Sequence, residues 1–363
     1  MLRALPIRRT NPVCPMGATI RDVARRAGVS ISTVSRVLND TCPVHPDKRR
    51  LVLDAADALG YAPNPAARSL LNKKTGGLGV LLPFVSGEFF SEFLSALDKA
   101  AQQNDLFLVI STSHRRLSEF TGAMQALDKR VDGLIVMAPE LLPSDITSIV
   151  RTEDPVVFVN TRAEGLPFDT VNFDNHQGAR ALTQHLLDLG HKRIAFVRGP
   201  SDAHDAMERL RGYRDAMLEA GLGLDPTLEV HGEYTLEAGY AATRTLLARN
   251  VQPTAIIAAN DYAAIGVLRA LHEAHLRVPE DVSVGGFDGL NSGLYTLPPL
   301  TTVRAPIRKI GQIAITLLLE RLRYPERERA TQRRVLPVEL VARASTAPPA
   351  RPGVRIRATG RSR

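Results

Sequence analysis

From residue 78 onward, short apolar runs alternate with longer amphipathic segments, and this alternation constrains the fold more than any other feature of the chain. The apolar runs include GLIVM and PVVFVN in the first half of this region, and RIAFVRG and VSVGGFD in the second half. Strands that alternate with helices form parallel sheets, and such strands are apolar throughout because both faces are buried. The sequence therefore predicts an α/β fold with parallel sheets.

The alternation falls into two series, which predicts two similar lobes. The first series has strands at LGVLLPF, LFLVIS, GLIVM and 155–160, with helices near 89–103 and 117–130. The second has strands at 193–199, 254–260 and 282–288, with helices near 175–189, 206–220, 236–249 and 262–275. Loops at the carboxyl ends of the strands would line a cleft between the lobes.

The first 75 residues have a different pattern and are predicted to be all-α. A helix over 19–28 is capped by Thr19 and ended by Gly28, a second follows at 31–38 after a cap at Ser30, and a third covers about 47–59. Three short helices with a tight turn between the first two form the helix-turn-helix plan. The expected buried stripes are Ile20, Val23, Ala24, Ala27, then Val34, Val37, Leu38, then Leu51, Val52, Ala55, Ala56 and Leu59.

The second of these helices carries a polar face of small hydroxyls and one arginine. In the helix-turn-helix plan, the first residues of this helix meet base edges in the major groove. Hydroxyls of Ser32, Thr33 and Ser35 can reach bases or phosphates. The Arg36 guanidinium can bind O6 and N7 of guanine, and Ile31 can pack on a thymine methyl group. The alternative is a solvated polar face, and the charge distribution favours DNA.

Net charge is +8 over the whole chain, and it is unevenly distributed. Residues 1–75 have a net charge of +8, residues 76–342 of −6, and residues 343–363 of +6. A basic end on an acidic body indicates that the end, and not the body, meets a polyanion.

A short helix is predicted at 65–71, where Asn64 suits the N-cap and Pro65 the first helical position. A helix of this length is unstable alone in water, so it needs a partner, either its twin in a dimer or DNA. Gly76 and Gly77 then mark a domain boundary.

Several classes of protein are disfavoured. No apolar run reaches about 18 residues, so no membrane span is expected. Two cysteines, Cys14 and Cys42, favour a reducing compartment, and the N-terminus lacks the apolar core of a secretory signal. No nucleophile elbow, metal-ligand cluster or P-loop lysine is present, so we expect no catalytic residues, no metal and no cofactor. A periplasmic sugar-binding protein would have no use for the first 75 residues, and an architectural DNA binder would have no use for cleft residues.

Taken together, ATIRDVARRAGVSISTVSRVLN, GYAPNPAARSL, RLRGY, ANDYAAIG, DVSVGGFD and LPPLTTV resemble the lactose-repressor (LacI/GalR) family over about residues 18–342. The resemblance implies a cytoplasmic, nucleoid-associated bacterial transcription regulator. Such a regulator is usually a homodimeric repressor on a pseudo-palindromic operator. Its two-lobed body resembles type I periplasmic binding proteins, and a small effector, most often a sugar, binds there and controls operator affinity.

The resemblance also implies site residues. The residues expected at DNA are Thr19, Ile31, Ser32, Thr33, Ser35, Arg36 and Asn39 in the headpiece, and Ala67, Arg68 and Leu70 on the hinge helix. Leu70 matches the leucine that the family wedges into the minor groove. The residues expected at the effector are Phe89, Phe90, Asn160, Arg162, Arg209, Tyr234, Asn260 and Asp288. Cys42 departs from a polar or basic residue of the family. His204-Asp205 stands where many sugar-binding members have a small hydroxyl residue, so the effector's identity stays open, as does the direction of its effect on DNA.

The expected domains are a flexible basic arm at 1–17, the headpiece at 18–62, the hinge helix and linker at 63–75, the effector-binding and dimerisation domain at 76–342, and a disordered basic tail at 343–363. Met16 resembles the family's usual start, which would place residues 1–15 upstream of the working protein. Residues 344–363 contain three prolines and no leucine, so a tetramerising leucine heptad segment is not expected and a dimer is. Candidate dimer contacts are Phe93, Leu94, Leu97 and Ala101.

Overall fold

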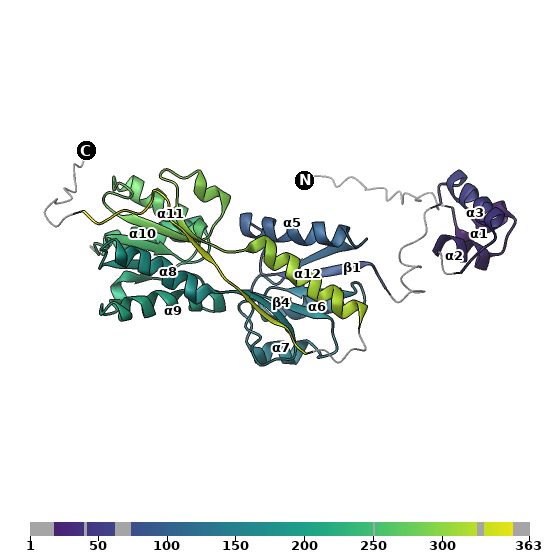
Figure 1. Ribbon diagram of the computed structural model, residues 1–363, viewed down its shortest axis with the longest axis horizontal. Coiled ribbons are helices and arrows are strands. Elements are labelled where there is room, and N and C mark those ends of the chain that lie inside the picture. The colour runs from purple at the N-terminus through teal and green to yellow at the C-terminus, as the bar shows by residue number, and fades with distance from the viewer. Residues whose placement is uncertain (1–17, 40–41, 62–73, 250, 325–329, 351–363) are drawn as a thin grey trace, which may run out of the picture. The chain divides into compact units, whose positions relative to one another are not determined.

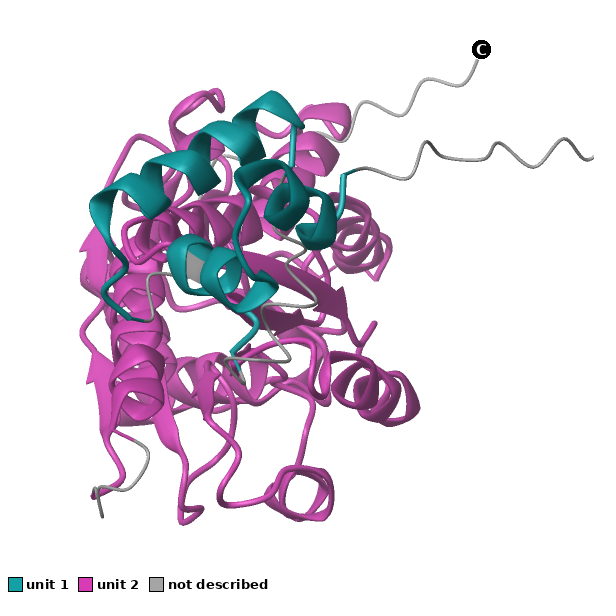
Figure 2. Cartoon of the chain, turned by 90° about the vertical axis from the view of Figure 1, so that its right-hand side faces the viewer, with its two compact units in different colours: residues 1–75 teal, residues 76–363 magenta. Residues whose placement is uncertain are grey.

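The computed structural model describes residues 18–39, 42–61, 74–249, 251–324 and 330–350. The chain divides into two compact units, residues 1–75 and residues 76–363 (Figure 2). We describe each unit by itself, because each has a hydrophobic core of its own.

Unit 1 contains the three helices expected from the sequence. They are α1 (Ile20–Ala27), α2 (Ile31–Asn39) and α3 (Pro46–Ala58) (Figure 1). Thr19 and Asp22 form a capping box at the start of α1, and Gly28 ends it in the left-handed conformation, with φ of 66°. The hydroxyl oxygen of Ser30 accepts a hydrogen bond from the backbone N–H of Thr33, so Ser30 caps α2 as predicted. The helix predicted at 65–71 lies outside the described residues.

The core of unit 1 lies between the apolar stripes of its three helices. Its buried members are Val23, Ala24, Ala27, Val34, Val37, Val52, Ala55 and Ala56. The predicted stripe of α3 was wrong at Leu51, whose side chain is 49% exposed. The stripe runs through 52, 55, 56 and 59, which is the i, i+3, i+4, i+7 pattern of one helix face, and residue 51 falls beside it.

Unit 2 contains two six-stranded sheets, one in each lobe. The first-lobe sheet has the order β11-β5-β4-β3-β1-β2, with β1 (Gly77–Leu82), β2 (Phe107–Thr112), β3 (Gly133–Val136), β4 (Val156–Val159), β5 (Asp169–Phe173) and β11 (Arg333–Leu336). The second has the order β12-β10-β9-β8-β6-β7, with β6 (Ile194–Val197), β7 (Glu229–Val230), β8 (Ala255–Ala258), β9 (Ser283–Asp288), β10 (Thr301–Arg304) and β12 (Glu339–Val341). Every strand pair in these sheets is parallel except β10 with β12. The predicted two-lobed α/β fold is confirmed.

Helices cover both faces of each sheet. In the first lobe these are α5 (Glu88–Gln102), α6 (Leu117–Leu127), α7 (Pro143–Ile149) and α12 (Ile307–Arg323). In the second they are α8 (Asn175–Asp188), α9 (His204–Glu219), α10 (Leu236–Ala248) and α11 (Asp261–Glu273), with short 3-10 turns at Pro226–Leu228 and Asn291–Leu294. The helices of the second lobe form two pairs, α8 with α9 and α10 with α11. No helix in these described segments is long and apolar enough to cross a membrane.

The chain crosses between the lobes three times. It leaves the first lobe after β5, returns after β10 to form α12 and β11, and leaves again to form β12. In Figure 1 the last crossing is the yellow segment that runs along both lobes. Each lobe is therefore built from separate stretches of sequence.

The prediction of a disordered tail was wrong for residues 344–350. Ser345 is fully buried, and its hydroxyl donates to the Val284 carbonyl oxygen at 2.6 Å and accepts from the Thr301 N–H at 2.8 Å. Hydrogen bonds to the second lobe hold this segment in place, so its sequence does not need apolar residues at helix or strand spacing. Residues 351–363 lie outside the described residues.

The predicted dimer contacts on α5 were also largely wrong. Phe93, Leu97 and Ala101 are buried against the first-lobe core, and Leu94 is half-buried. Helix α12 packs against α5. The two helices are so close at Gly311 that a Cβ there would lie 3.1 Å from the Cβ of Ala96 and 3.3 Å from the carbonyl oxygen of Phe93. The apolar stripe of α5 is thus used within its own lobe.

Candidate functional site

Helix α2 of unit 1 presents its polar face to solvent. Val34 and Val37 are buried and anchor the helix on α1 and α3, while Ile31, Ser32 and Arg36 are exposed. An exposed isoleucine and an exposed arginine on one helix can supply the apolar and the bidentate contacts that base recognition uses.

Three of the predicted DNA-contacting hydroxyls form hydrogen bonds at the starts of α1 and α2. The Ser30 hydroxyl lies 2.8 Å from the hydroxyls of both Ser32 and Thr33, and the Thr19 hydroxyl donates to Asp22 at 2.6 Å. These bonds fix the starts of α1 and α2 and so orient the polar face. Ser35 is half-buried. The side chain of Asn39, and Ala67, Arg68 and Leu70, lie outside what the structure describes.

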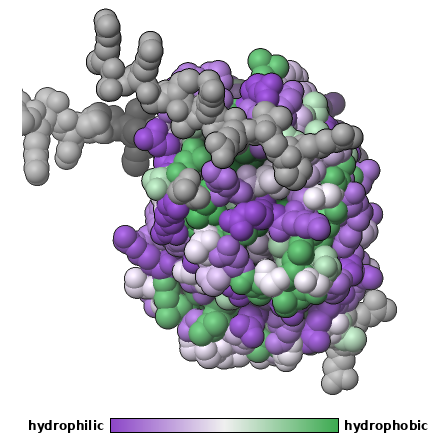
Figure 3. Space-filling model, turned by 90° about the vertical axis from the view of Figure 1, so that its left-hand side faces the viewer, coloured by the Kyte–Doolittle hydropathy of each residue, from purple (hydrophilic) through white to green (hydrophobic). Residues whose placement is uncertain are grey.

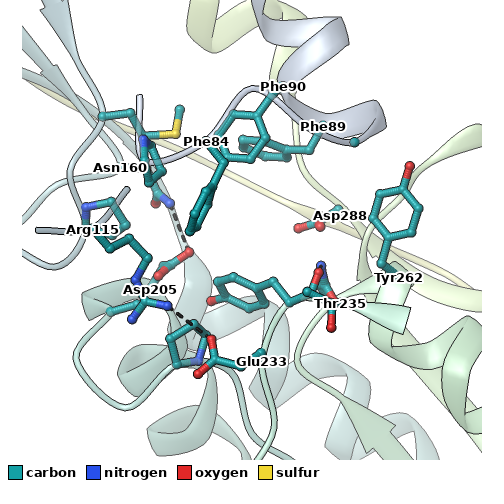
Figure 4. A pocket seen from close by; sticks show the side chains of 18 of the residues that line it. Phe84, Phe89, Phe90, Arg115, Asn160, Asp205, Glu233, Thr235, Tyr262 and Asp288 are labelled. Atoms are coloured by element: carbon teal, nitrogen blue, oxygen red, sulfur yellow. Dashed lines mark hydrogen bonds and ion pairs between the residues drawn. The ribbon is translucent and has the colours of Figure 1, made fainter. Parts of the chain in front are cut away.

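A pocket of about 320 Å³ lies in unit 2 between the two lobes (Figure 4). Its walls come from loops at the carboxyl ends of strands in both sheets, as the sequence predicted. The first lobe contributes Pro83, Phe84, Ser86, Gly87, Phe89, Phe90, Arg115, Met137, Pro139 and Asn160. The second lobe contributes Pro200, Ala203, Asp205, Arg209, Glu233, Tyr234, Thr235, Asn260, Tyr262 and Asp288.

Arg209 of α9 is the central buried charge of this pocket. One of its Nη atoms lies 3.2 Å from an Asp288 oxygen and donates to the Ala259 carbonyl oxygen at 2.6 Å. Its Nε donates to Asn175 at 2.9 Å, and its guanidinium lies 3.8 Å from the ring centre of Phe287. Paired and stacked in this way, the charge is satisfied although the side chain is almost fully buried.

Hydrogen bonds link this charge to the first lobe. Asn160, which follows β4 and has a φ of 46°, donates to Asp205 at 3.2 Å. Asn175 donates in turn to Asn160 at 3.1 Å, and Asp205 lies 3.9 Å from Arg209. Figure 4 shows Asn160 and Asp205 facing each other across the pocket. A group bound here would therefore contact a network that spans both lobes.

Burial and charge shift the pKa values of these groups. Burial raises the pKa of Asp288 to about 7, although Arg209 draws it down. Burial disfavours the charge of Arg209, but Tyr234, Asp288 and Asp205 outweigh this and raise the pKa of its guanidinium. Burial, followed by the negative charge of Asp205, raises the pKa of the Tyr234 hydroxyl well above 10. The Tyr234 hydroxyl is thus a neutral donor, and within the described residues its oxygen has no hydrogen-bond partner.

A second cation, Arg115, bridges the lobes at the edge of the pocket. It follows β2 in the first lobe and pairs with Glu233 at 3.1 Å and with Asp202, both from the second lobe. Figure 4 shows Arg115 and Glu233 joined below the aromatic side chains. This pairing ties the two lobes together where the pocket opens.

Asn260 has two roles. Its side-chain oxygen accepts from the Ala263 N–H at 2.9 Å and caps α11, while its amide lines the pocket and donates to the Tyr234 carbonyl oxygen at 3.3 Å. A capping residue at the end of β8 is held rigidly, which suits a ligand contact.

Seven of the eight predicted effector residues line the pocket. They are Phe89, Phe90, Asn160, Arg209, Tyr234, Asn260 and Asp288. Arg162 is not among the lining residues and its side chain is exposed, because the chain turns away from the cleft after Asn160. Sequence reasoning missed Phe84, Arg115, Glu233 and Tyr262 as site residues. Asp205 could have been predicted as a site residue, because it stands where many sugar-binding members of the family have a small hydroxyl residue.

No three His, Cys, Asp or Glu side chains in the described part of the chain are grouped so that they could hold a metal ion. His191, a possible ligand by residue type, is 1% exposed and bonds to Thr254 and Ala347. Its place is structural.

Comparison with known proteins links both units to one kind of regulator. Residues 19–64 match the model of bacterial regulatory proteins of the lacI family, and residues 183–346 match that of a periplasmic binding protein-like domain. The HTH-type transcriptional repressor PurR of Photobacterium profundum is 34% identical, over 86% of this chain and 94% of its own. The ribose operon repressor of Escherichia coli is 35% identical, over 85% and 94%. The crystal structure of the lac repressor dimer bound to operator and the anti-inducer ONPF is 31% identical, with a TM-score of 0.82 over 91% of this chain and 99% of its own. These relatives are transcription regulators and not enzymes.

Proposed function

The chain belongs to the lacI family of bacterial regulatory proteins, and from this we propose that it represses transcription by binding a DNA operator under the control of a small effector. The observation that carries the proposal is the exposed polar face of α2, held by caps on a separately packed headpiece. Unit 2 adds a pocket enclosed by two lobes, which is the place for the effector.

In the headpiece, Ile31, Ser32 and Arg36 read bases, because their side chains are exposed on one helix face. Thr19 and Thr33 position α1 and α2, and these two residues, Ser35 and Asn39 are proposed to contact the DNA backbone. Ala67, Arg68 and Leu70 belong to the hinge helix, with Leu70 as the minor-groove wedge.

The effector that we propose is a sugar or sugar derivative. Asp205 and Asp288 can each engage two neighbouring hydroxyl groups, and Arg209, the Tyr234 hydroxyl and the Asn260 amide add further polar contacts. Aromatic side chains such as Phe84 supply apolar surface against a sugar ring. At about 320 Å³, the pocket is at the small end of ligand sites, which favours one or two rings over a longer chain. The ribose operon repressor among the relatives supports a sugar by its name.

A homodimer on a pseudo-palindromic operator is part of the proposal. Large apolar side chains are exposed on both lobes, Phe107 and Ile110 on the edge strand β2 and Leu294, Tyr295 and Leu297 after β9. Tyr295 and Leu297 are 84% and 94% exposed, which is unusual for such residues outside an interface. On the end of unit 2 that Figure 3 shows, apolar side chains are scattered among hydrophilic ones, so we do not place the contact there.

The test is selection of bound DNA from a random pool, with and without a panel of candidate sugars. We expect enriched sites with two-fold symmetry, and at least one sugar that changes their recovery. Enrichment of isolated half-sites would contradict the dimer, and no sequence preference at all would contradict the role of α2. The matched variant Arg36→Ala should lose preference at one base pair of each half-site.

A further inference from the structure

We propose that the effector is uncharged and that the cleft rejects phosphorylated and carboxylated sugars. The inference rests on the proposed function, because it concerns the same pocket. It follows from how the cations of the pocket are already engaged.

The charge of Arg209 is already paired with two carboxylates, Asp288 at 3.2 Å and Asp205 at 3.9 Å. Its three nitrogens face Asp288, Asp205, the Ala259 carbonyl oxygen and the Asn175 amide oxygen. A phosphate would have to displace two carboxylates that sit on the same guanidinium, and those carboxylates would then face the phosphate unpaired. Uncompensated charge in a buried site is strongly unfavourable.

Arg115, the other cation that lines the pocket, is also shared between two carboxylates. Asp202 and Glu233 approach it from the second lobe, and both contacts hold the lobes together. An anion that binds Arg115 would therefore have to compete with two carboxylates, and it would break ion pairs that hold the two lobes together.

Helix N-termini, which otherwise attract anions, are already occupied at this pocket. Helices α5, α9, α10 and α11 all begin at lining residues, and each carries an acid in its first turn: Glu88, Asp205, Glu237 and Asp261. At three of these starts a backbone N–H already donates to a side-chain oxygen: Ala206 to Asp205, Ala238 to Thr235 and Ala263 to Asn260. The positive ends of the helix dipoles are thus compensated before a ligand arrives.

The balance of charge on the lining residues points the same way. Asp205, Glu233 and Asp288 oppose Arg115 and Arg209, an excess of one negative charge. If Asp288 takes up a proton, the lining is neutral, and Arg115 and Arg209 are still paired with carboxylates. A phosphate monoester carries about −1.5 to −2 at pH 7, so it meets a neutral or repulsive site.

An uncharged polyol meets no such conflict. Its hydroxyls can donate to Asp205 and Asp288 without displacing Arg209, and one of its oxygens can accept from the Tyr234 hydroxyl. A cationic ligand gains little, because each carboxylate already faces Arg115, Arg209 or Asn160. Each hydroxyl group of the ligand can donate to a carboxylate or accept from the Tyr234 hydroxyl, and neither bond brings a net charge into the pocket.

The first arm of the test measures calorimetric binding of matched sugars to the full chain. The pairs are ribose with ribose 5-phosphate, and glucose with glucose 6-phosphate, glucuronate and glucosamine, and the panel is extended with neutral disaccharides. For any sugar that binds, we expect its phosphorylated or carboxylated counterpart to bind at least about 100-fold more weakly, and glucosamine to bind no more tightly than glucose. A phosphorylated or carboxylated member that binds as tightly as its neutral counterpart, or glucosamine that binds more tightly than glucose, overturns the inference and leaves the proposed function intact.

The second arm does not depend on which sugar binds. Inorganic phosphate is titrated into the wild type, Glu233→Gln and Asp205→Asn, with Glu208→Gln as the matched control. Glu208 lies on α9, pairs with Arg211 and does not line the pocket. We expect no phosphate binding in the cleft of the wild type or the control. Glu233→Gln and Asp205→Asn, which each remove one carboxylate from a cation of the pocket, should bind phosphate at least about tenfold above the detection limit.

Two results of this second arm decide the matter even when no sugar binds. Phosphate binding by the wild type that Arg115→Gln abolishes would overturn the inference, as would equal phosphate binding by all four proteins after competition with operator DNA at the headpiece. If the charge variants behave as expected and no sugar of the panel binds or changes operator binding, the carbohydrate proposal fails and charge exclusion stands. Glu233 is partly exposed, so Glu233→Gln should fold, and its unfolding curve checks this.

Discussion

At the residue scale, the headpiece separates side chains that position α2 from side chains that are free to read DNA. Thr33 shares the capping bonds of Ser30, and Thr19 is held by Asp22. Ile31 and Arg36 point away from the core and are exposed. Base preference should therefore depend on Ile31 and Arg36 more than on the threonines.

We expect Arg36→Ala to relax base preference at one position of each half-site, at a cost of about 1–3 kcal/mol, because a bidentate contact to guanine is lost. Competition binding with operator variants measures this. Arg26→Ala, an exposed arginine of α1, serves as the control and should weaken all sites alike. A mutant that keeps its full base preference and only loses salt dependence would identify Arg36 as a phosphate contact.

Sequence reasoning found the cleft residues that are tied to motifs and missed those that depend on contacts across the cleft. Arg209, Asn260 and Asp288 stand in recognisable stretches next to strands or helix starts. Arg115 and Glu233 are separated by 118 residues and lie in loops, so no local sequence pattern predicts that they pair. Arg162, which is exposed and does not line the pocket, stays a prediction, because the direction of a side chain after a turn cannot be read from its neighbours.

At the element scale, glycines set the spacing of the helix pairs in the second lobe. A Cβ at Gly266 of α11 would lie 2.0 Å from the Leu236 carbonyl oxygen of α10, and one at Gly212 of α9 would lie 2.1 Å from the His176 carbonyl oxygen of α8. The helix backbones are in contact at these points, and an alanine fits only if the helices move apart.

Gly266→Ala should destabilise the protein by about 1–3 kcal/mol, since overpacking outweighs the gain in helix propensity. Gly122→Ala in α6 is the control. A Cβ at Gly122 meets nothing within 4 Å, so this change should stabilise the protein by about 0.5–1 kcal/mol. Urea unfolding of both variants measures the difference, and equal effects would show that the α10–α11 contact is loose.

The segment at 343–347 depends on a neutral histidine. His191 Nε2 lies 2.8 Å from the Ala347 carbonyl oxygen, which can only accept, so this nitrogen carries the proton, while Nδ1 lies 2.9 Å from the Thr254 hydroxyl. Burial lowers the pKa of His191. The unfolded chain takes up a proton near pH 6.5, where the folded chain does not.

The stability contributed by His191 is therefore present above about pH 6.5 and is lost as the pH falls below it. We expect the free energy of unfolding to drop between pH 7.5 and 5.5 in the wild type, and to drop less in His191→Gln. The exposed His272 supplies the control variant, His272→Gln, which should follow the wild type. The protection factors for hydrogen exchange at residues 345–347, corrected for the intrinsic pH dependence of exchange, should fall over the same range. An identical pH profile for wild type and His191→Gln would contradict this.

Strands with a continuous apolar run were predictable, including the edge strand β2, and strands without one were not. β8 and β9 are buried throughout, and they were found from their apolar runs. β11, Arg333–Leu336, is mostly exposed and begins with two arginines, so it has no such signature. Its pairing with β5 supplies the stability that its own sequence lacks.

At the scale of the whole molecule, the exposed apolar side chains predict how copies of the chain associate. Phe107 and Ile110 lie on the edge strand of the first-lobe sheet, and an exposed hydrophobic edge strand tends to pack against another chain. The described residues after β12 lie along the second lobe, so they do not form a tetramerising helix.

Light scattering at micromolar concentration should give a mass near twice the 39.6 kDa of one chain. Phe107→Lys should shift this mass toward one chain, because a charge in the contact is left without a partner. Leu218→Lys, an exposed leucine on α9, should leave the dimer intact. A mass near four chains, or dissociation by both variants alike, would refute the contact.

The three crossings between the lobes have a consequence for how the chain is made. The headpiece can fold as soon as it leaves the ribosome, because its core is contained within its own residues. The first lobe cannot, since α12 and β11 belong to its sheet and are synthesised after nearly all of the second lobe. During synthesis, the headpiece is thus folded while the first lobe still lacks α12 and β11. The apolar surface that α12 covers in the complete lobe is exposed at this stage, and we expect the nascent chain to depend most on chaperones then.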